Sequence, residues 1–593
     1  MTLRQAFQAA MIAITSVHGT SAWAGQAAAV PQLGAVDRSG DAIRSAEARE
    51  KPRLIVLTDI GTEPDDIESM IRVLTYANEI EIEGLIAATS RHLSKRVYPQ
   101  LIEQRVAAYG QVLNNLRVHD PAYPDAALLK ARIRSWRTEP GMQGVGQGKD
   151  NDASRLIIEA VDKADNRPVW VAVWGGAAPL AQALWHVRAT RSPREVATFV
   201  AKLRVYSISD QDDAGPWARA TFPHLFWVAS IHGISKYELA TWTGISAALP
   251  GADNAVVSRE WLRGNIQSKG PLGQLYPLPL FIMEGDTPSF LNLIDNGLSV
   301  PERPDWGGWG GRWEQPSPAF GHWADTVDAV RGEDGKDYSS NKASVWRWRK
   351  AFQNDFLMRM NWSISPRFAD ANHAPQLVVN GQGGSAPLTL TVCPGEEVRL
   401  SAAGSRDPDG NTLSYRWWAY GEAGSSYFAR ATLATPDAAQ TTVTVKPWTS
   451  PPGFDLLPVE RAHVILEVND NGTPAVTRYR RVMLDVPTDG RRVNGKVCPK
   501  IAVMPEPEGI EFATGAEVVP PGWTTSHSDI GSLLDNPQTR AIVARHLPVV
   551  VETGSAAVQA RNMTIRALKA FVPGITDELL AKIDAELKLV PKP

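Results

Sequence analysis

The sequence predicts an α/β protein with an open, mostly parallel sheet and helices on both faces, followed by an Ig-like β-sandwich and a small helical tail. Three observations predict this order. The chain has 593 residues, which is too many for one hydrophobic core. Short apolar runs alternate with amphipathic stretches up to Trp362, and after His373 the apolar period changes to two.

The composition is that of a folded protein and excludes several classes. Hydrophobic residues make up 43% and charged residues 21%, while the 47 glycines and 43 prolines are too few for collagen or a disordered chain. The 61 basic residues are balanced by 64 acidic ones, and the sequence has no basic stripe. Nucleic acid is therefore not an expected partner. The 20 tryptophans are unusually many.

The first predicted strand and helix occupy residues 54–58 and 67–77, where an apolar run precedes a stretch with apolar residues on one face. Strands at 80–89 and 168–174 follow, and residues 179–187 form the helix after the second of these. Because strands alternate with helices, the sheet is expected to be parallel. Further strands are expected at 203–207 and 278–283, and a helix is expected at 342–360.

The sequence after His373 alternates apolar and polar side chains, with turn signals between the runs. This pattern predicts an Ig-like sandwich. Its strands are expected at 388–392, 441–445, 464–468 and 479–486. The tail beyond it carries amphipathic helices at 529–546 and 577–587.

The first 24 residues have the pattern of a secretory signal peptide. Arg4 supplies the positive charge, residues 6–17 are mostly apolar, and Ala22-Trp23-Ala24 has the small-x-small form of a cleavage site. Cleavage is expected after Ala24, which places the mature protein in the periplasm or outside the cell. No later stretch is long and apolar enough to span a membrane.

The domain organisation follows from these changes of pattern. The expected parts are a signal peptide at 1–24, a linker at 25–50, an α/β domain at 51–372, a β-sandwich at 373–498, a connector at 499–525 and a helical module at 526–593. Cys393 and Cys498, the two cysteines of the chain, bracket the sandwich. Export permits a disulfide between them, and two buried thiols are the alternative.

Four acidic residues, Asp59, Glu63, Asp65 and Asp66, lie within eight residues between the first strand and its helix. Capping of the helix is the simpler interpretation, because acidic side chains favour a helix N-terminus. One carboxylate is enough for that purpose, and four repel one another. A hard divalent cation such as Ca²⁺ relieves this repulsion, since it binds carboxylate and carbonyl oxygens. The cluster therefore predicts a metal site.

Polar groups also follow the other predicted strands. The residues at these ends are Ser90, Trp174, Asp210, Asp212, Asp213 and Asp286. Taken singly, each is explained by a loop that faces water, but ligands of open parallel sheets gather at the carboxyl ends of strands. A shared crevice is therefore expected. A cation there lowers the pKa of water and a carboxylate acts as base, which is hydrolysis chemistry.

The stretch Thr58-Asp59-Ile60-Gly61 with Glu63-Pro64-Asp65-Asp66 resembles the aspartate motif of nucleoside hydrolases, and residues 171–176 resemble their second glycine-rich strand end. Over residues 52–487 the chain is more closely similar to exported bacterial proteins often described as cellulose-binding. These proteins join a nucleoside hydrolase-like domain to an Ig-like one. Residues 82–87 and 346–349 also carry this resemblance.

The resemblance implies a role for each matching residue. Asp59 corresponds to the general base and a Ca²⁺ ligand, and Asp66 to a second ligand. Asp65 corresponds to a contact for sugar hydroxyls, Trp174 offers its backbone carbonyl to the metal, and Asp286 is the late ligand. The remaining candidates for substrate binding are Glu63, Ser90, Asp210, Asp212 and Asp213.

Three departures from the nucleoside hydrolase pattern favour a sugar or another alcohol over a nucleobase as the leaving group. Asp59 lies six residues before Asp65, which is further than in the hydrolase motif. Thr89-Ser90 stands where an asparagine is expected after the second strand. Asp286 has no neighbouring histidine that protonates a purine.

Tryptophans cluster in a glycine-rich stretch that cannot form a stable helix. Trp306, Trp309 and Trp313 are expected on a loop near the crevice, where flat rings suit the C–H faces of sugars, and Arg312 binds hydroxyls or a carboxylate. Packing of the same rings over the end of the domain is the equal alternative.

These observations favour an exported hydrolase that cleaves glycosidic bonds of carbohydrates, including furanosides, by Ca²⁺-assisted attack of water with Asp59 as base. A carbohydrate or glycoside is the expected partner, and a homo-oligomer is possible. A second hypothesis is a carbohydrate-binding protein that keeps the hydrolase fold without turnover. A third is a nucleosidase.

Overall fold

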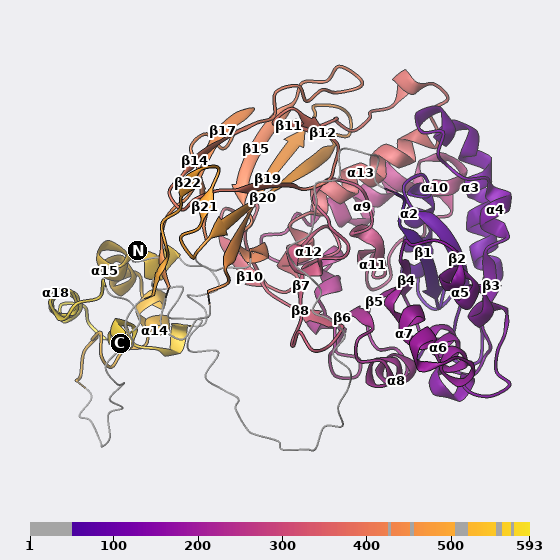
Figure 1. Cartoon of the computed structure of the whole chain (residues 1–593), viewed down its shortest axis with the longest axis horizontal. Helices are drawn as coiled ribbons and strands as arrows, with labels where there is room; N and C mark the ends of the chain where they lie inside the picture. The colour runs from indigo at the N-terminus through magenta and orange to yellow at the C-terminus, as the bar shows by residue number, and fades with distance from the viewer. Residues whose placement is uncertain are drawn as a thin grey trace.

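The computed structural model describes residues 50–424, 429–450, 456–503, 520–552, 560–570 and 574–592. The expected signal peptide and the linker up to residue 49 lie outside these ranges. Within them, none of the helices has the length and apolarity needed to cross a bilayer. Figure 1 shows an α/β part, a strand-rich part beside it, and a small group of helices at the C-terminal end.

The α/β part is built on an eight-stranded sheet with the order β3-β2-β1-β4-β5-β6-β8-β7. Its strands are β1 (Arg53–Thr58), β2 (Glu81–Ala87), β3 (Ile133–Ser135), β4 (Val169–Val173), β5 (Leu203–Ser207), β6 (Phe226–Ala229), β7 (Trp313–Glu314) and β8 (His322–Asp325). All neighbours pair in parallel except β7 and β8. The predicted parallel sheet is therefore confirmed.

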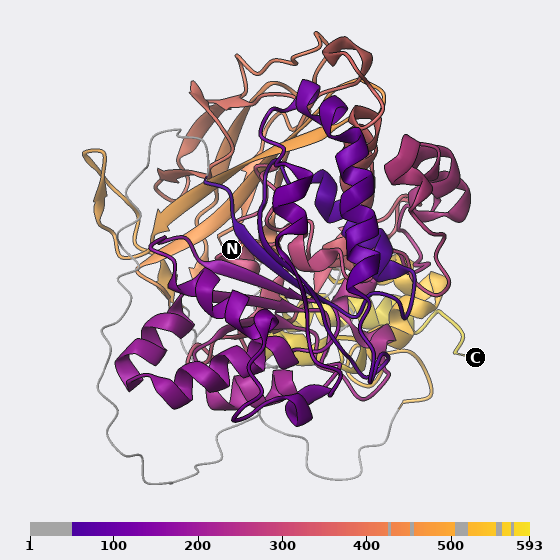
Figure 2. The same ribbon diagram turned by 90° about the vertical axis from the view of Figure 1, so that its right-hand side faces the viewer.

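Helices cover both faces of this sheet (Figure 2). One face packs against α2 (Asp65–Thr75), α3 (Pro99–His119) and α13 (Arg349–Trp362), and the other against α5 (Asp152–Asp162) and α6 (Ala178–Thr190). The reason is visible in β1, since alternate residues of a strand point to opposite faces.

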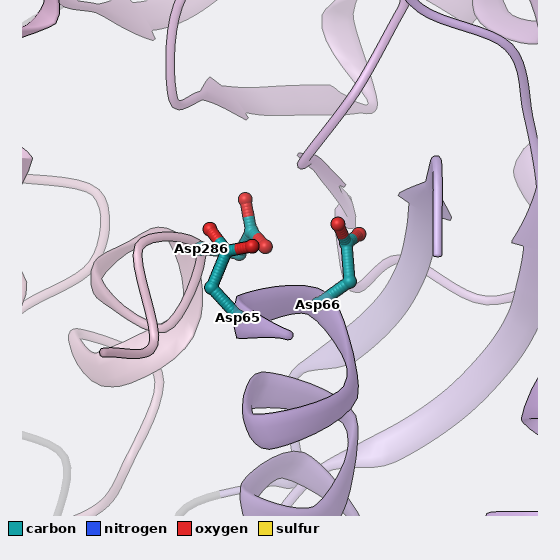
Figure 3. Close-up of side chains that lie close together, drawn as sticks. All are labelled: Asp65, Asp66 and Asp286. Atoms are coloured by element: carbon teal, nitrogen blue, oxygen red, sulfur yellow. The ribbon is translucent and has the colours of Figure 1, made fainter. Parts of the chain in front are cut away.

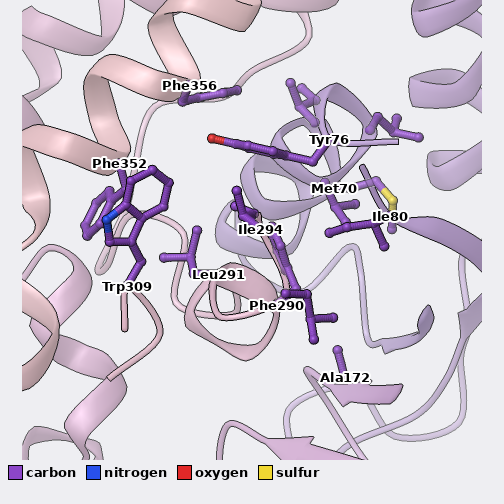
Figure 4. Packing of buried hydrophobic residues seen from close by; sticks show 14 of the residues in the cluster. Met70, Tyr76, Ile80, Ala172, Phe290, Leu291, Ile294, Trp309, Phe352 and Phe356 are labelled. Carbon is purple, nitrogen blue, oxygen red and sulfur yellow. The ribbon is translucent and has the colours of Figure 1, made fainter. Parts of the chain in front are cut away.

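The side chains of β1 divide between two apolar cores. Leu54 and Val56 join the core that contains α2 and α13, while Ile55 and Leu57 join the core of α5 and α6. Figure 4 shows part of the first core, where the ring of Tyr76, directly after α2, lies near Phe356 of α13. A strand buried on both faces is fixed in register, and this fixes the position of the residue that follows it.

Three predicted elements were wrong in detail. The helix expected at 529–546 is two helices, α14 (Ile530–Asp535) and α15 (Pro537–His546). Residues 278–283 do not form a strand but run over the surface, and Pro277 and Pro279 explain this, because proline cannot donate a ladder hydrogen bond. The single helix predicted at 342–360 is two helices, α12 (Ala343–Trp346) and α13.

The strand-rich part forms two facing sheets around one apolar core, as predicted. One sheet has the order β13-β20-β19-β15 and the other β14-β17-β16. The strands are β13 (Leu388–Thr391), β14 (Glu397–Ser401), β15 (Ser414–Ala419), β16 (Ala431–Leu433), β17 (Gln440–Val445), β19 (Val459–Asn469) and β20 (Thr477–Pro487). Cys393 and Cys498 form a disulfide, which settles the alternative left open by the sequence.

The tail consists of α14 (Ile530–Asp535), α15 (Pro537–His546), α16 (Pro548–Glu552) and α18 (Asp577–Leu587). These helices bury their own apolar cluster, separate from the cores of the other parts. The amphipathic pattern of the tail is therefore explained by the packing of its helices against one another.

A buried ionic network joins the α/β part to the sandwich. Asp355 of α13 accepts hydrogen bonds from Tyr76 Oη directly after α2 at 2.8 Å, Arg478 Nη1 of β20 at 2.6 Å and Arg359 Nε at 3.1 Å. Burial alone raises the pKa of Asp355, but Arg478 and Arg359 lower it to about 2. The carboxylate is thus charged and paired with two guanidinium groups.

We expect Asp355→Asn to destabilise the protein by about 3–5 kcal/mol, because it removes the buried counter-charge of Arg478 and one of the two carboxylates that pair with the buried Arg359. The measurement is urea unfolding at neutral pH. Asp337→Asn is the matched control, since Asp337 lies on an exposed hairpin with an ion pair at 3.6 Å, and we expect a change within about 0.5 kcal/mol. Equal losses in the two variants would contradict the role of the network.

Candidate metal centre and substrate pocket

The candidate site lies where the strand order of the sheet reverses. The chain leaves β1 toward β2 and β3 and returns on the other side of β1 at β4. Ligands bind at such switch points, beyond the carboxyl ends of the strands. Asp59 directly follows β1 and Trp174 directly follows β4. Both line a pocket of about 350 Å³.

Three carboxylates converge in this pocket. Asp65 and Asp66 begin α2, and Asp286 precedes the short helix α11 (Pro288–Leu291). One oxygen from each lies within 4.8 Å of the other two, and Figure 3 shows all three side chains beside the N-terminus of α2. Asp286 is 3% exposed, and its buried Oδ2 has no hydrogen-bond partner among the described residues. This donor set fits a hard divalent cation.

Burial and mutual repulsion oppose ionisation of these carboxyl groups. Burial raises the pKa of Asp65 to about 7, with Glu63 and Asp59 adding to the shift. Burial also raises the pKa of Asp66 and of Asp286 well above the usual range, and the neighbouring aspartates raise both further. A divalent cation among the three reverses this preference, because it stabilises the charged form of each carboxyl.

Asp59 stands beside the three carboxylates and is held by hydroxyl groups. Ser90 Oγ donates to Asp59 Oδ2, and Thr62 Oγ1 donates to the backbone carbonyl of Asp59 at 2.9 Å. Burial raises the pKa of Asp59, and the bond from Ser90 opposes the rise. Gly175 permits this position, because a Cβ there would lie 2.6 Å from Asp59 Oδ1.

The geometry distributes the predicted roles differently from the resemblance. It groups Asp65 with Asp66 and Asp286, whereas the sequence assigned Asp65 to sugar hydroxyls and Asp59 to the metal. Ser90 does not line the pocket and acts through Asp59. Glu63 lines the pocket.

The backbone carbonyl of Trp174 accepts a hydrogen bond from Gln211 Nε2 at 2.6 Å, so one lone pair of the predicted ligand is already used. The indole Nε1 of Trp174 donates to Ser289 Oγ at 2.8 Å, and Ser289 Oγ donates to the carbonyl of Asp286 at 2.6 Å. The end of β4, which carries Trp174, and the loop after β5, which carries Gln211, are therefore linked by hydrogen bonds to the segment that carries Asp286.

A buried ion pair holds the segment that carries Asp286 in place. Arg72 of α2 pairs with Glu284, whose backbone N–H donates to Glu68 Oε2 at 2.8 Å. Tyr276 Oη and Thr287 Oγ1 also donate to the Glu284 carboxylate, at 2.7 and 2.9 Å. Sequence reasoning missed this support. The available signal was a pair of charged residues, Glu68 and Arg72, one turn apart on a helix with an otherwise largely apolar inward face.

The acidic group after β5 does not reach the pocket, contrary to its prediction as a substrate contact. Asp210 pairs with Arg219 at 2.6 Å, and Asp212 accepts from the backbone N–H of Ala214 at 3.0 Å at the start of α8 (Ala214–Thr221). Asp213 accepts from the N–H of Met142 at 2.7 Å. Each of these carboxylates bonds to a local donor, although the buried Oδ2 of Asp212 has no hydrogen-bond partner within the described part of the chain. Gln211 is the residue of this loop that lines the pocket.

The predicted sugar platform is also corrected. Trp306, Trp309 and Trp313 are buried, and none of them lines the carboxylate pocket. Trp309 packs edge-on against Tyr479 of the sandwich. Arg312 is buried as well and pairs with Asp328 at 2.6 Å. The alternative that these rings pack over the end of the domain is the one that the structure supports.

Residues that the sequence did not single out form the wall of the pocket. Tyr237 and Trp242 lie on a loop after β6, and their ring centroids are 6.1 Å apart. His92 Nε2 lies 2.8 Å from Tyr237 Oη. Phe281 lines the mouth. Their segments have no apolar period and no motif, so only the fold brings them together.

Fold and site together define a nucleoside hydrolase-like α/β protein. Residues 53–313 match the model of the nucleoside hydrolase-like domain of cellulose-binding Sde182, and residues 397–486 match the C-terminal domain of cellulose-binding protein Sde0182. The chain belongs to this family of cellulose-binding proteins with a nucleoside hydrolase-like domain.

A solved structure agrees with this assignment. It is a nucleoside hydrolase-related hypothetical protein from Saccharophagus degradans that is associated with carbohydrate metabolism. The two sequences are 36% identical, the match covers 74% of this chain and 100% of the other, and the TM-score is 0.62. A comparison with curated proteins finds no significant match.

The raised pKa values predict how stability depends on pH and on the cation. Without a cation, the folded state holds protons on Asp65, Asp66 and Asp286 that the unfolded state has lost above about pH 4, so stability falls as pH rises toward 7. We expect chelated protein to melt at a lower temperature at about pH 7.5 than at about pH 5 through this contribution.

Addition of Ca²⁺ at about pH 7.5 should restore stability by about 2.7 kcal/mol at a hundredfold excess over its Kd. The measurement is calorimetric melting with chelator and with Ca²⁺, and Asp286→Asn is the control that should lose most of the response. A melting temperature that does not change on chelation at about pH 7.5 would count against the metal site.

Proposed function

We propose that this protein is an exported, cation-dependent glycoside hydrolase that acts on carbohydrate. The observation that carries the proposal is the buried, unpartnered oxygen of Asp286 beside Asp65 and Asp66, next to Asp59 in one pocket. These are hard oxygen donors, and Ca²⁺ is the cation that we propose for them. The disulfide between Cys393 and Cys498 supports export, because such bonds persist in oxidising compartments.

Asp59 is the proposed general base. When bound, the cation supplies positive charge that makes a water molecule in the pocket more acidic. Burial raises the pKa of Asp59 toward the range in which a base is effective at neutral pH. Ser90 and Thr62 orient its carboxylate, and Gly175 lets it approach the end of β4. Proton transfer from water to Asp59 then yields a nucleophile for the anomeric carbon.

The departing oxygen needs a proton as well. Asp286 lies between Gly285 and Thr287, so no histidine beside it supplies one. His92 and Tyr237, which are hydrogen-bonded at 2.8 Å in the pocket wall, are the proposed donors. Glu63 is the proposed contact for sugar hydroxyls, since carboxylates accept hydrogen bonds from them. An alcohol or sugar suits this arrangement as leaving group.

A second candidate is carbohydrate binding without turnover. The description of the family as cellulose-binding favours it, and the same pocket offers the acidic and aromatic groups that bind a sugar. The two functions differ in whether the bond breaks after binding. A nucleosidase, the third hypothesis, predicts release of ribose from inosine or uridine.

We expect Asp59→Asn to lower hydrolysis by about 10²–10⁴-fold while carbohydrate binding persists, because the amide cannot take the proton. The measurement is release of reducing sugar from aryl glycosides and oligosaccharides, with binding followed by calorimetry. Asp210→Asn is the matched control, since Asp210 follows β5 but pairs with Arg219 outside the pocket. Its activity should match that of the unmodified protein.

The same experiment separates the candidates. Hydrolysis that survives Asp59→Asn would overturn the assignment of the base. Binding without release in the unmodified protein would establish the second candidate instead. Release of ribose from inosine at a higher rate than sugar from any glycoside would establish the nucleosidase.

A further inference from the structure

Two surface segments at the mouth of the carboxylate pocket expose large apolar side chains. One is the loop after β6, where Ile234 is 73% exposed and Leu239 is also exposed. The other is the stretch of residues 280–282, where Leu280 is exposed and Phe281 is 84% exposed. Phe281 and Ile282 line the pocket from the second segment, as do Tyr237 and Glu238 from the first. We call the four exposed side chains of these segments, Ile234, Leu239, Leu280 and Phe281, the apolar shelf, and of these Phe281 lines the pocket.

The exposure of the shelf is built into the fold. Ser246 Oγ accepts from the backbone N–H of Met283 at 3.1 Å and donates to its carbonyl at 3.0 Å, which anchors the chain directly after Phe281 and Ile282. Met283 itself is buried. Phe281 is therefore held outward by an anchored backbone. Leaving such a ring in water forgoes about 25 cal/mol per Å² of apolar area, so exposed apolar groups that gather at a pocket mark a binding surface.

The size of the pocket limits what can enter it. A volume of about 350 Å³ is near the lower end for small-molecule sites. It accommodates one end of a sugar chain but not a polymer. The units that follow must leave through the mouth, and Phe281 stands there. Aromatic rings bury the C–H faces of sugars well because they offer a large, rigid apolar surface.

The charge of the pocket selects among sugars. Asp59, Glu63, Asp65, Asp66 and Asp286 all line it, and Glu238 stands at its edge. The pocket lining among the residues that the structure describes includes no Lys or Arg side chain. Phosphorylated sugars and uronic acids find no basic side chain there, and a neutral sugar chain fits.

We propose that the pocket binds the end of a neutral oligosaccharide or polysaccharide while the apolar shelf, with Phe281 at its centre, binds the next sugar units outside. This inference rests on the proposed carbohydrate function and adds the substrate class: chain ends of neutral glycans. The shelf takes over the role that the sequence assigned to the buried tryptophans 306, 309 and 313.

The test is a calorimetric series with glucose, cellobiose and cellotetraose in the presence of Ca²⁺. In the unmodified protein, affinity rises with chain length. Phe281→Ala lowers the affinity for cellotetraose by about tenfold, which corresponds to about 1.4 kcal/mol, and leaves that for glucose within about twofold. Phe320→Ala is the matched control, because Phe320 is 52% exposed beside a different hollow with Arg219 and Phe222. It leaves all three affinities unchanged.

Two further ligands test whether the shelf binds something other than a neutral sugar chain. Tetragalacturonate, which is charged, binds at least about tenfold more weakly than cellotetraose. Inosine tests whether a nucleobase stacks on Phe281. A larger loss of inosine affinity than of cellotetraose affinity in Phe281→Ala would overturn the inference, and so would self-association of the unmodified protein that Phe281→Ala abolishes.

The failure of this inference is distinguishable from failure of the proposed function. If the unmodified protein binds cellotetraose and Phe281→Ala binds it equally well, the shelf is overturned while carbohydrate binding stands. If the unmodified protein binds none of the three sugars, both are overturned. Asp286→Asn reports on the pocket alone, since we expect it to weaken glucose and cellotetraose by the same factor.

Discussion

The repulsion among buried carboxyl groups at the end of β1 is the constraint on which the account depends. Asp65, Asp66 and Asp286 approach within 4.8 Å in one pocket, where Asp66 and Asp286 are buried and Asp65 is half-buried. Their raised pKa values express the resulting cost of ionisation. The fold nevertheless holds them there with a buried ion pair between Arg72 and Glu284. A site supported in this way is explained by a cation that offsets the repulsion.

The fold could be predicted because its signals are local. The apolar run of β1, with side chains that alternate between two cores, and the one-sided pattern of α2 both follow from the period of each element. Asp59, Asp65 and Asp66 are close in sequence, and a strand-to-helix turn brings them to one edge. The period of two in residues 388–486 likewise predicted the sandwich. The strand expected at 278–283 failed because its apolar residues alternate with prolines.

Much of the site could not be predicted, because it depends on contacts between distant segments. An acidic residue after a strand has the same sequence signal whether it faces the crevice or a neighbouring arginine, as Asp210 does with Arg219. Trp309 and Trp313 could cover a sugar or pack over the end of the domain, and contacts with distant segments decided the outcome. Trp309 packs against Tyr479 of β20, and Trp313 against Tyr206 of β5. His92, Tyr237 and Phe281 come from loops whose place is set by the whole sheet. Among the distant candidates, Asp286 lies beside Asp65 and Asp66.

The central claim is that a divalent cation replaces protons among these carboxyl groups. The most direct measurement is a titration of chelated protein with Ca²⁺ at neutral pH, repeated in buffers of different ionisation enthalpy so that proton release is counted. The account predicts one Ca²⁺ per chain, bound with release of protons, and loss of both in Asp286→Asn. Binding without proton release, or no binding at all, would contradict it.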